Sequence, residues 1–232
     1  MKIFLVCVMA FVFMLNSTAS AEEKIPTISV SGEGVVEVTP DRATISLGVV
    51  TRDKNAAKVQ NDNAKIATDI INSVAALGID KKNIRTGNYS FHQCYRQDNS
   101  RRVPEGYEAN NTVTVIVDDL NLVGKVIDSA LASGANNVDS LEFGIKNKTT
   151  LQNEAIRLAV RDARAKAEVV AAELGKKIIG VLNVSVNSGY ISAPRANKFA
   201  MAEMAMDSAA TPIESGTLTC SASVHVEFEI GR

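Results

Sequence analysis

This 232-residue chain has two histidines, His92 and His225, and histidine is the residue type most suited to metal or acid–base chemistry. The alternation of apolar residues turns both side chains outward from their predicted strands. A metal site would require them to converge on neighbouring strands, with Cys94 as a third ligand and further polar groups to orient them. We therefore interpret both as solvated histidines and expect no metal ligands, no catalytic residues and no cofactor-binding residues.

Cysteine is the second source of chemistry, and Cys94 and Cys220 lie beyond the N-terminal leader. An oxidising compartment would permit a disulfide between them. Cys220 is in phase with the apolar residues of the last predicted strand, which indicates a buried thiol, whereas Cys94 is out of phase with its aromatic neighbours. We expect Cys94 to be the exposed thiol. No disulfide is expected within one chain, because the two side chains leave opposite sheet faces.

Catalytic motifs are absent from the sequence. Gly32-Glu33-Gly34 has the look of a phosphate-binding turn, but a dinucleotide fingerprint must open a helix, and here a strand follows. The chain has no Walker loop, no nucleophile elbow and no HExxH. Triad chemistry needs a paired histidine and carboxylate beside a nucleophile, and the sequence displays no such pair. We expect a protein that is not an enzyme, with a hydrolase of dispersed site as a third alternative.

Segment 187–215 is rich in alanine, serine and methionine. At its centre Met201, Met204 and Met206 could bind Cu(I), which prefers soft ligands, or serve as oxidisable sulfur. Methionine also fills adaptable interfaces, so the favoured interpretation is a flexible insertion with a short helix that packs on the domain or on a neighbouring subunit. A soft-metal or oxidant-buffering module is the alternative function.

Composition and charge limit the classes of partner. With 25 basic and 26 acidic residues the chain has a formal net charge of -1, whereas general nucleic-acid binding requires a basic surface. An apolar fraction of 46% is ample for a folded core, in one large domain or two small ones. We therefore expect no nucleic-acid partner.

Residues 1–21 have the pattern of a secretory signal peptide. A basic residue precedes an apolar run from Ile3 to Leu15, and Ala19-Ser20-Ala21 forms a small-residue cleavage site. The run is shorter than the roughly 20 residues that span a bilayer core. We expect cleavage after Ala21 and a mature domain over 22–232, with an uncleaved anchor as the alternative. The mature sequence has no other segment apolar enough to cross a membrane.

The elements that must position these residues begin with the stretch Ile28–Val50. Apolar residues fall on even positions before Pro40-Asp41 and on odd positions after it. A two-residue turn there would put both apolar sets on one sheet face, so the pattern predicts a β-hairpin. In that register Gly34 lies opposite Leu47 and leaves a gap that a helix could approach closely.

Helix and strand patterns alternate through the middle of the chain. From residue 43 to 145 the predicted order is strand, helix, strand, strand, helix, strand, with a polar loop from Arg96 to Gly106 between the central strands. This order matches a ferredoxin-like βαββαβ unit. We expect an α+β layered fold with extensions to that core, in which a largely antiparallel sheet carries helices on one face.

The longest predicted helix covers about 150–174, with Thr149 and Gln152 as its capping box. Half of its inner stripe is alanine, at Ala159, Ala163, Ala167 and Ala171, and the other half is larger residues, namely Ile156, Val160, Val170 and Leu174. So many alanines indicate close approach to a flat surface, such as the glycine-containing sheet face. Strands at 178–186 and 217–230 complete the fold.

Four stretches carry a family resemblance. They are Gly32-Glu33-Gly34, Pro40-Asp41-Arg42-Ala43, the long helix with Ala163, Ala165 and Ala167, and the terminal strand ending Val224–Ile230. Together they resemble the SIMPL family over nearly the whole mature chain. The resemblance implies a periplasmic protein, with a secreted or envelope-associated one as the alternative. It also implies no agreed enzymatic activity, a link to oxidative-stress defence, and self-assembly into homo-oligomers.

One face of the last predicted strand carries short polar side chains. Its outward residues are Thr217, Thr219, Ser221, Ser223, His225, Glu227 and Glu229. Such a face can meet water, as in many antiparallel sheets, or line the lumen of an assembly. The residue types are compatible with both.

Overall fold

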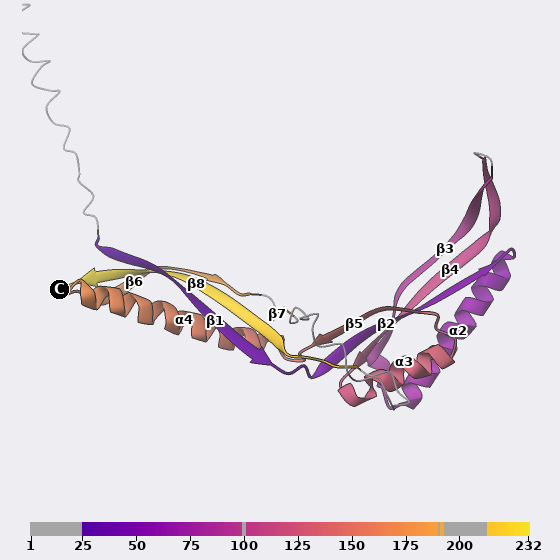
Figure 1. The fold of residues 1–232 in the computed structure, drawn as a ribbon, viewed down its shortest axis with the longest axis horizontal. Coiled ribbons are helices and arrows are strands. Elements are labelled where there is room, and N and C mark those ends of the chain that lie inside the picture. The colour runs from indigo at the N-terminus through magenta and orange to yellow at the C-terminus, as the bar shows by residue number, and fades with distance from the viewer. Residues whose placement is uncertain (1–24, 99–100, 190, 193–212) are drawn as a thin grey trace, which may run out of the picture.

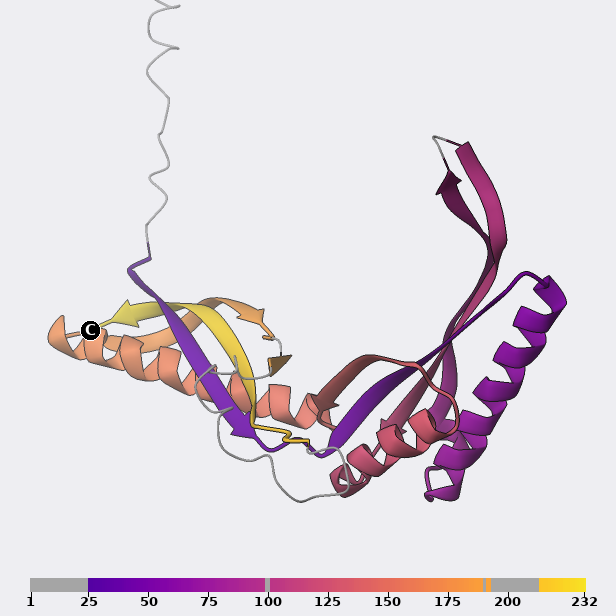
Figure 2. The same ribbon diagram turned by 45° about the vertical axis from the view of Figure 1, so that its right-hand side comes forward.

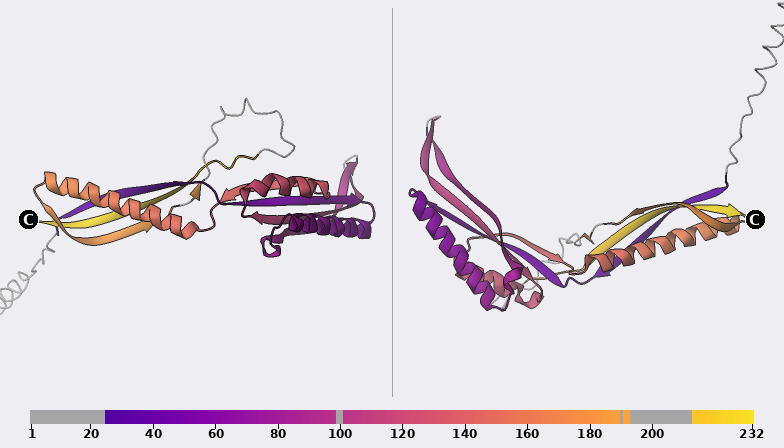
Figure 3. Two further views of the ribbon diagram at one scale, coloured as in Figure 1. Left: turned by 90° about the horizontal axis from the view of Figure 1, so that it is seen from below. Right: turned by 180° about the vertical axis from the view of Figure 1, so that it is seen from behind.

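A computed structural model of the chain describes residues 25–98, 101–189, 191–192 and 213–232. The predicted signal peptide and the Met201–Met206 segment lie outside these ranges. Two antiparallel sheets lie end to end in an elongated molecule, each with helices on one face (Figures 1 and 3). No helix within the described ranges is long and apolar enough to cross a membrane.

Sheet A contains the first and last strands of the described chain. Its strands are β1 (Thr27–Val38), β8 (Leu218–Gly231) and β6 (Lys177–Asn187), in the order β1-β8-β6, with β7 (Ile191–Ser192) also paired to β8. One long helix, α4 (Lys148–Glu173), packs along the sheet over β1 and β8 (Figure 2). Sheet A is therefore a two-layer unit built from residues at both ends of the described chain.

Sheet B contains the middle of the chain. Its strands are β2 (Arg42–Asp53), β3 (Ile84–Asp98), β4 (Arg101–Val117) and β5 (Asn137–Gly144), in the order β3-β4-β2-β5. Helices α2 (Ala56–Ala76) and α3 (Val123–Ala132) cover one face, with 3-10 turns at Lys81–Asn83 and Leu120–Leu122. This is the ferredoxin-like order, so the predicted α+β layered fold and its βαββαβ core are confirmed.

Asparagines begin both long helices. The Asn55 side chain accepts a hydrogen bond from the Lys58 N–H at 3.1 Å, and Asn147 caps Thr150 in the same way at 3.1 Å. The predicted capping box at Thr149 and Gln152 is therefore wrong, because the first unpaired N–H groups of α4 are satisfied two residues earlier. The end of the helix agrees with the predicted range, because α4 ends at Glu173 and Gly175 follows with a φ of 62°.

The predicted hairpin at Pro40-Asp41 is wrong. β1 pairs with β8, where Gly34 lies opposite Ala222, and β2 pairs with β4 and β5. Residues 39–41 carry the chain from sheet A to sheet B, and the Asp41 carboxylate accepts a hydrogen bond from the Lys146 N–H at 2.7 Å. Apolar residues change from even to odd positions here because β1 and β2 each bury one face in their own sheet. A tight turn between two paired strands would produce the same change.

Close approach of a helix to the glycines of β1 is confirmed. A side-chain carbon built on Gly34 would overlap the Ala155 carbonyl oxygen and lie 2.6 Å from the Ala159 nitrogen. Gly32 faces Ala159 and Ala163 in the same way. The helix meets the strand backbone through an alanine row in which every residue is fully or almost fully buried: Ala155, Ala159, Ala163, Ala167 and Ala171.

Three of the four larger residues of the predicted α4 stripe lie outside this contact, whereas Ile156 is partly buried and packs against the cluster of Ala155 and Cys220. Val160, Val170 and Leu174 remain largely exposed, which corrects the prediction that they share the inner face. At the separation that glycine and alanine allow, a branched side chain has no room between helix and sheet. These residues therefore flank the alanine row.

Strands β3 and β4 form a long hairpin that projects beyond the helices, and we call its outer part, residues 89–98 and 101–107, the β3–β4 arm (Figure 1). The predicted loop from Arg96 to Gly106 is wrong, because β3 runs to Asp98 and β4 starts at Arg101. Ring contacts support the arm: Phe91 stacks on Tyr107 with centroids 5.8 Å apart, and the Arg102 guanidinium lies over Tyr95. Its polar residues are strand residues exposed on both faces.

Candidate functional site

A row of three charged or ionisable side chains crosses sheet B on the face opposite the helices. Glu108 of β4 lies directly across from Arg52 of β2 on one side and from His92 of β3 on the other. Side chains alternate along a strand, and the buried neighbours Val49 and Ala109 point to the helix side. Three adjacent strands therefore place one carboxylate between a guanidinium and an imidazole.

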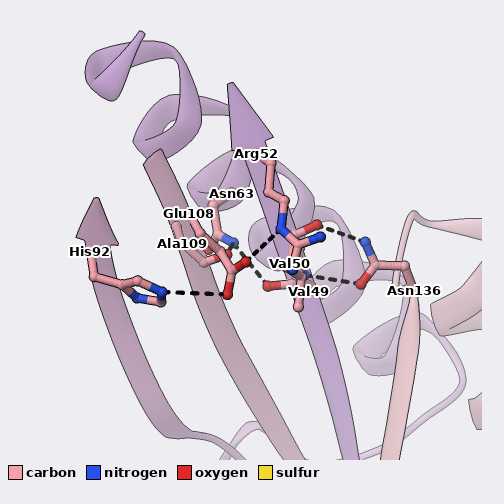
Figure 4. A network of polar contacts seen from close by, with 8 residues as sticks. All are labelled: Val49, Val50, Arg52, Asn63, His92, Glu108, Ala109 and Asn136. Carbon is pink, nitrogen blue, oxygen red and sulfur yellow. Dashed lines mark hydrogen bonds and ion pairs between the residues drawn. The ribbon is translucent and has the colours of Figure 1, made fainter. Parts of the chain in front are cut away.

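Glu108 divides its two oxygens between these partners (Figure 4). Arg52 Nε donates to Glu108 Oε2 at 2.5 Å, and His92 Nε2 lies 3.8 Å from Glu108 Oε1. The Glu108 side chain is only 15% exposed, whereas Arg52 and His92 are mostly in solvent. The carboxylate is thus held in a fixed orientation with one oxygen directed to the histidine.

Cys94 joins this row from β3, two residues beyond His92 and on the same sheet face. Among the described residues, the ligand atoms of His92, Cys94 and Glu108 all lie within 4.8 Å of one another. The ladder shifts register between Cys94 and Tyr95, so an irregularity directly follows the thiol. A nitrogen, a sulfur and an oxygen donor therefore gather on two paired strands.

The cluster borders an open hollow of about 500 Å³. Its lining includes acids and bases from three strands and the β2–α2 connection: Arg52, Asp53, Lys54, Cys94, Glu105, Gly106, Tyr107 and Glu108. The hollow opens to solvent at the base of the β3–β4 arm, so a small ion or molecule could reach the cluster from outside.

Local contacts favour the charged forms of two residues beside the hollow, Arg52 and Asp53. The hydrogen bond to Glu108, and then the charge of that carboxylate, raise the pKa of Arg52. The Asn55 N–H, and then the Lys58 ammonium, lower the pKa of the Asp53 carboxyl. Both groups therefore carry full charge near neutral pH.

Two asparagines support the strands beneath the row (Figure 4). Buried Asn63 of α2 donates its amide to the carbonyls of Val49 at 3.0 Å and Ala109 at 3.2 Å, one on each of β2 and β4. Asn136, just before β5, uses its side chain to pair with both the N–H and the carbonyl of Val50. These bonds fix the backbone next to Arg52 and Glu108.

The two histidines do not come together. His92 lies in sheet B and His225 in sheet A, where its Nδ1 is 3.2 Å from the Ser31 hydroxyl. His225 belongs to the polar face of sheet A, opposite α4. A site that uses both histidines would need them on neighbouring strands, and the structure places them in different sheets.

Both described cysteines are free, as predicted. Cys220 is fully buried against α4, and burial raises the pKa of its thiol, whereas Cys94 is partly exposed. The reason predicted for the absence of a disulfide between them is wrong, because Cys94 and Cys220 lie in different sheets and not on opposite faces of one sheet.

Sequence reasoning missed Glu108 as the partner of His92 and Cys94. It found no histidine and carboxylate beside a nucleophile, and the structure brings all three together. The spacing of His92 and Cys94 on one strand face was visible, but the opposing strand was interpreted as beginning after a polar loop. The distance of 3.8 Å between His92 Nε2 and Glu108 Oε1 is beyond hydrogen-bond range. The two side chains therefore do not form a hydrogen-bonded acid–base pair, and each offers its own ligand atom.

Comparisons with known proteins show what this chain is similar to. The chain is 29% identical to the 26 kDa periplasmic immunogenic protein of Brucella melitensis, over 88% of this chain and 84% of that protein. It is 26% identical to Uncharacterized protein YggE of Escherichia coli K12, over 88% of this chain and 83% of that protein. The SIMPL profile, described as a protein of unknown function (DUF541), matches residues 28–228. The chain therefore belongs to the SIMPL family.

Proposed function

We propose that residues 22–232 form a non-catalytic extracytoplasmic protein that self-associates and contributes to envelope or oxidative-stress tolerance. The periplasmic name of the Brucella relative and the signal-peptide pattern of residues 1–21 support a periplasmic location for this chain. The family description assigns no activity. Self-association is the part of the proposal that the geometry of sheet A supports.

An exposed apolar strip on β6 carries the proposal. Val181, Val184 and Val186 lie across from Phe228, Val226 and Val224, the buried residues of β8 that face α4. The three β6 valines are nevertheless 55%, 50% and 49% exposed. They lie on the core side of the sheet but beyond the helix, because α4 packs mainly over β1 and β8.

A second copy of this chain is the occupant that best fits the strip. Among the described strands β6 lies at one edge of sheet A and pairs only with β8. Register shifts at Ile178/Gly180 and Val181/Asn183 interrupt its ladder, which disfavours simple addition of another strand. Side-chain packing of one apolar strip against another, in the manner of a subunit interface, would remove these valines from water.

Light scattering on the mature protein tests this interface. Val184→Glu places a charge in the strip and should shift the protein to a smaller species. Ser185→Glu is the matched control, because Ser185 lies across from His225 on the polar face and the same charge is added one residue away. A monomeric wild type, or an unchanged mass for Val184→Glu, would contradict self-association through β6.

Peroxide survival tests the physiological part. A strain that lacks the gene should be more sensitive to hydrogen peroxide, and wild-type protein should restore survival. If assembly is needed, Val184→Glu expressed at the same level should restore less. Equal survival of the deletion and parent strains would remove the oxidative-stress role and leave the assembly proposal to be judged by light scattering.

A further inference from the structure

We propose that His92, Cys94 and Glu108 bind one borderline transition-metal ion of the Zn²⁺ class on the open face of sheet B. This inference goes beyond self-association and does not depend on it, since the cluster and the β6 strip lie in different sheets.

The donor types fit such an ion. Imidazole nitrogen, thiolate sulfur and carboxylate oxygen are the three side-chain donors that zinc accepts, and three protein ligands leave a fourth position for water or a small molecule. Calcium and magnesium prefer oxygen donors only, and Cu(I) prefers several sulfur donors. A set with one nitrogen, one sulfur and one oxygen donor therefore disfavours calcium, magnesium and Cu(I).

The spacing fits after a small contraction. Zinc bonds of about 2.0 to 2.3 Å separate tetrahedral ligand atoms by roughly 3.5 Å. The donor atoms of His92, Cys94 and Glu108 are already within 4.8 Å of one another. His92 and Glu108 are direct cross-strand partners, so rotation of the exposed His92 side chain can shorten its distance to Glu108 without moving the paired backbone.

Arg52 supplies the orientation that a ligating carboxylate needs. It binds Glu108 Oε2 and leaves Oε1 directed to His92, which is the division expected when one oxygen binds metal and the other is held by a neighbouring group. Thiolate and carboxylate together balance the charge of a divalent ion. The remaining charges in the lining of the hollow balance, because Arg52 and Lys54 are matched by Asp53 and Glu105.

Titration calorimetry on the mature protein under reducing conditions tests the site. Zn²⁺ should bind with one ion per chain, and Ca²⁺ should give no saturable heat. Cys94→Ser, His92→Ala and Glu108→Gln should each weaken Zn²⁺ binding about a hundredfold, since loss of an oriented ligand exceeds the effect of its supporting groups. His225→Ala removes the other histidine of the mature chain and should leave the affinity unchanged.

Chemical protection gives a second readout. Saturating Zn²⁺ should slow alkylation of Cys94 by iodoacetamide at least about tenfold, as mapped by peptide mass, because a metal-bound thiolate is no longer free to react. Cys94→Ser is close in shape to the native residue, and circular dichroism would verify its fold.

Several results would overturn the proposal. These are the absence of saturable Zn²⁺ binding, binding that survives both Cys94→Ser and His92→Ala, or equal protection of Cys94 by Ca²⁺. Loss of Zn²⁺ binding in a triple variant of Met201, Met204 and Met206 to Leu, with Cys94→Ser still binding, would assign the metal to the methionine segment instead.

Discussion

Sheets A and B bury their helices in opposite ways. In sheet A the α4 helix touches the backbone of β1 at Gly32 and Gly34 through its alanine row, where added volume has no room, and larger residues of β8 such as Phe228 fill the rest of the contact. In sheet B two helices cover a core of valine, isoleucine and leucine, such as Leu47, Ile70 and Val115. The difference indicates that a larger side chain at Gly32 or Gly34 would lower the stability of sheet A, whereas a smaller core side chain would lower that of sheet B.

The largest effect is expected from a cavity in sheet B. Leu47 is fully buried among the strands and helices, so Leu47→Ala should lower the free energy of unfolding by about 2–5 kcal/mol. Denaturant titration would measure the loss, and hydrogen exchange would show it concentrated in β2, β4 and α2. An equal increase of exchange in α4 would contradict the separation of the two cores.

A smaller but clear loss is expected from added volume in sheet A. Gly34→Val would force a branched side chain into the backbone of α4 at Ala155 and Ala159, and overpacking typically costs about 1–3 kcal/mol. Glu33→Val is the matched control, because Glu33 is exposed on the opposite face. Unfolding midpoints that fall equally for both variants would mean that the outer face is itself buried in a subunit contact.

The smallest effect concerns the polar contact at the edge of the same helix. Asp162 accepts hydrogen bonds from Lys166 at 2.7 Å and from the Glu33 N–H at 2.8 Å, and these contacts lower its pKa in that order of importance. A depressed carboxyl pKa stabilises the fold above the unfolded value of about 3.9, and this contribution is lost as pH falls through the lower folded pKa.

Asp162→Asn should therefore show a shallower loss of stability in acid than the wild type. Thermal unfolding between about pH 2 and pH 6 would measure the two slopes, the window in which aspartate titrates. Because Asp162 is partly exposed, we expect a modest difference. Identical slopes would show that the contact does not contribute.

Sequence periodicity was sufficient for most of this architecture. The order of helix and strand patterns from residue 43 to 145 predicted the ferredoxin-like unit of sheet B, because each pattern is a local signal. The alanine row and the Gly32 and Gly34 pair also predicted close packing correctly. Pairing partners were not predictable in the same way: the switch of phase at Pro40-Asp41 is the same for a hairpin and for a crossing between sheets.

The candidate site was missed for a related reason. The β3–β4 arm has polar residues on both faces, so alternation gives no signal there, and residues 96–106 were interpreted as a loop. Without the arm, Glu108 had no assigned neighbour. Cross-strand register placed it beside His92 and Arg52, and register depends on long-range pairing that a single sequence does not display.

Native mass spectrometry of the mature protein with Zn²⁺ tests most directly whether the two sheets have separate roles. We expect a wild-type oligomer with one zinc ion per chain. We expect the Val184→Glu protein to form a smaller species that still binds one zinc ion per chain. A Val184→Glu protein that keeps the wild-type mass, or loses its zinc when it dissociates, would contradict the assignment of assembly to sheet A and metal binding to sheet B.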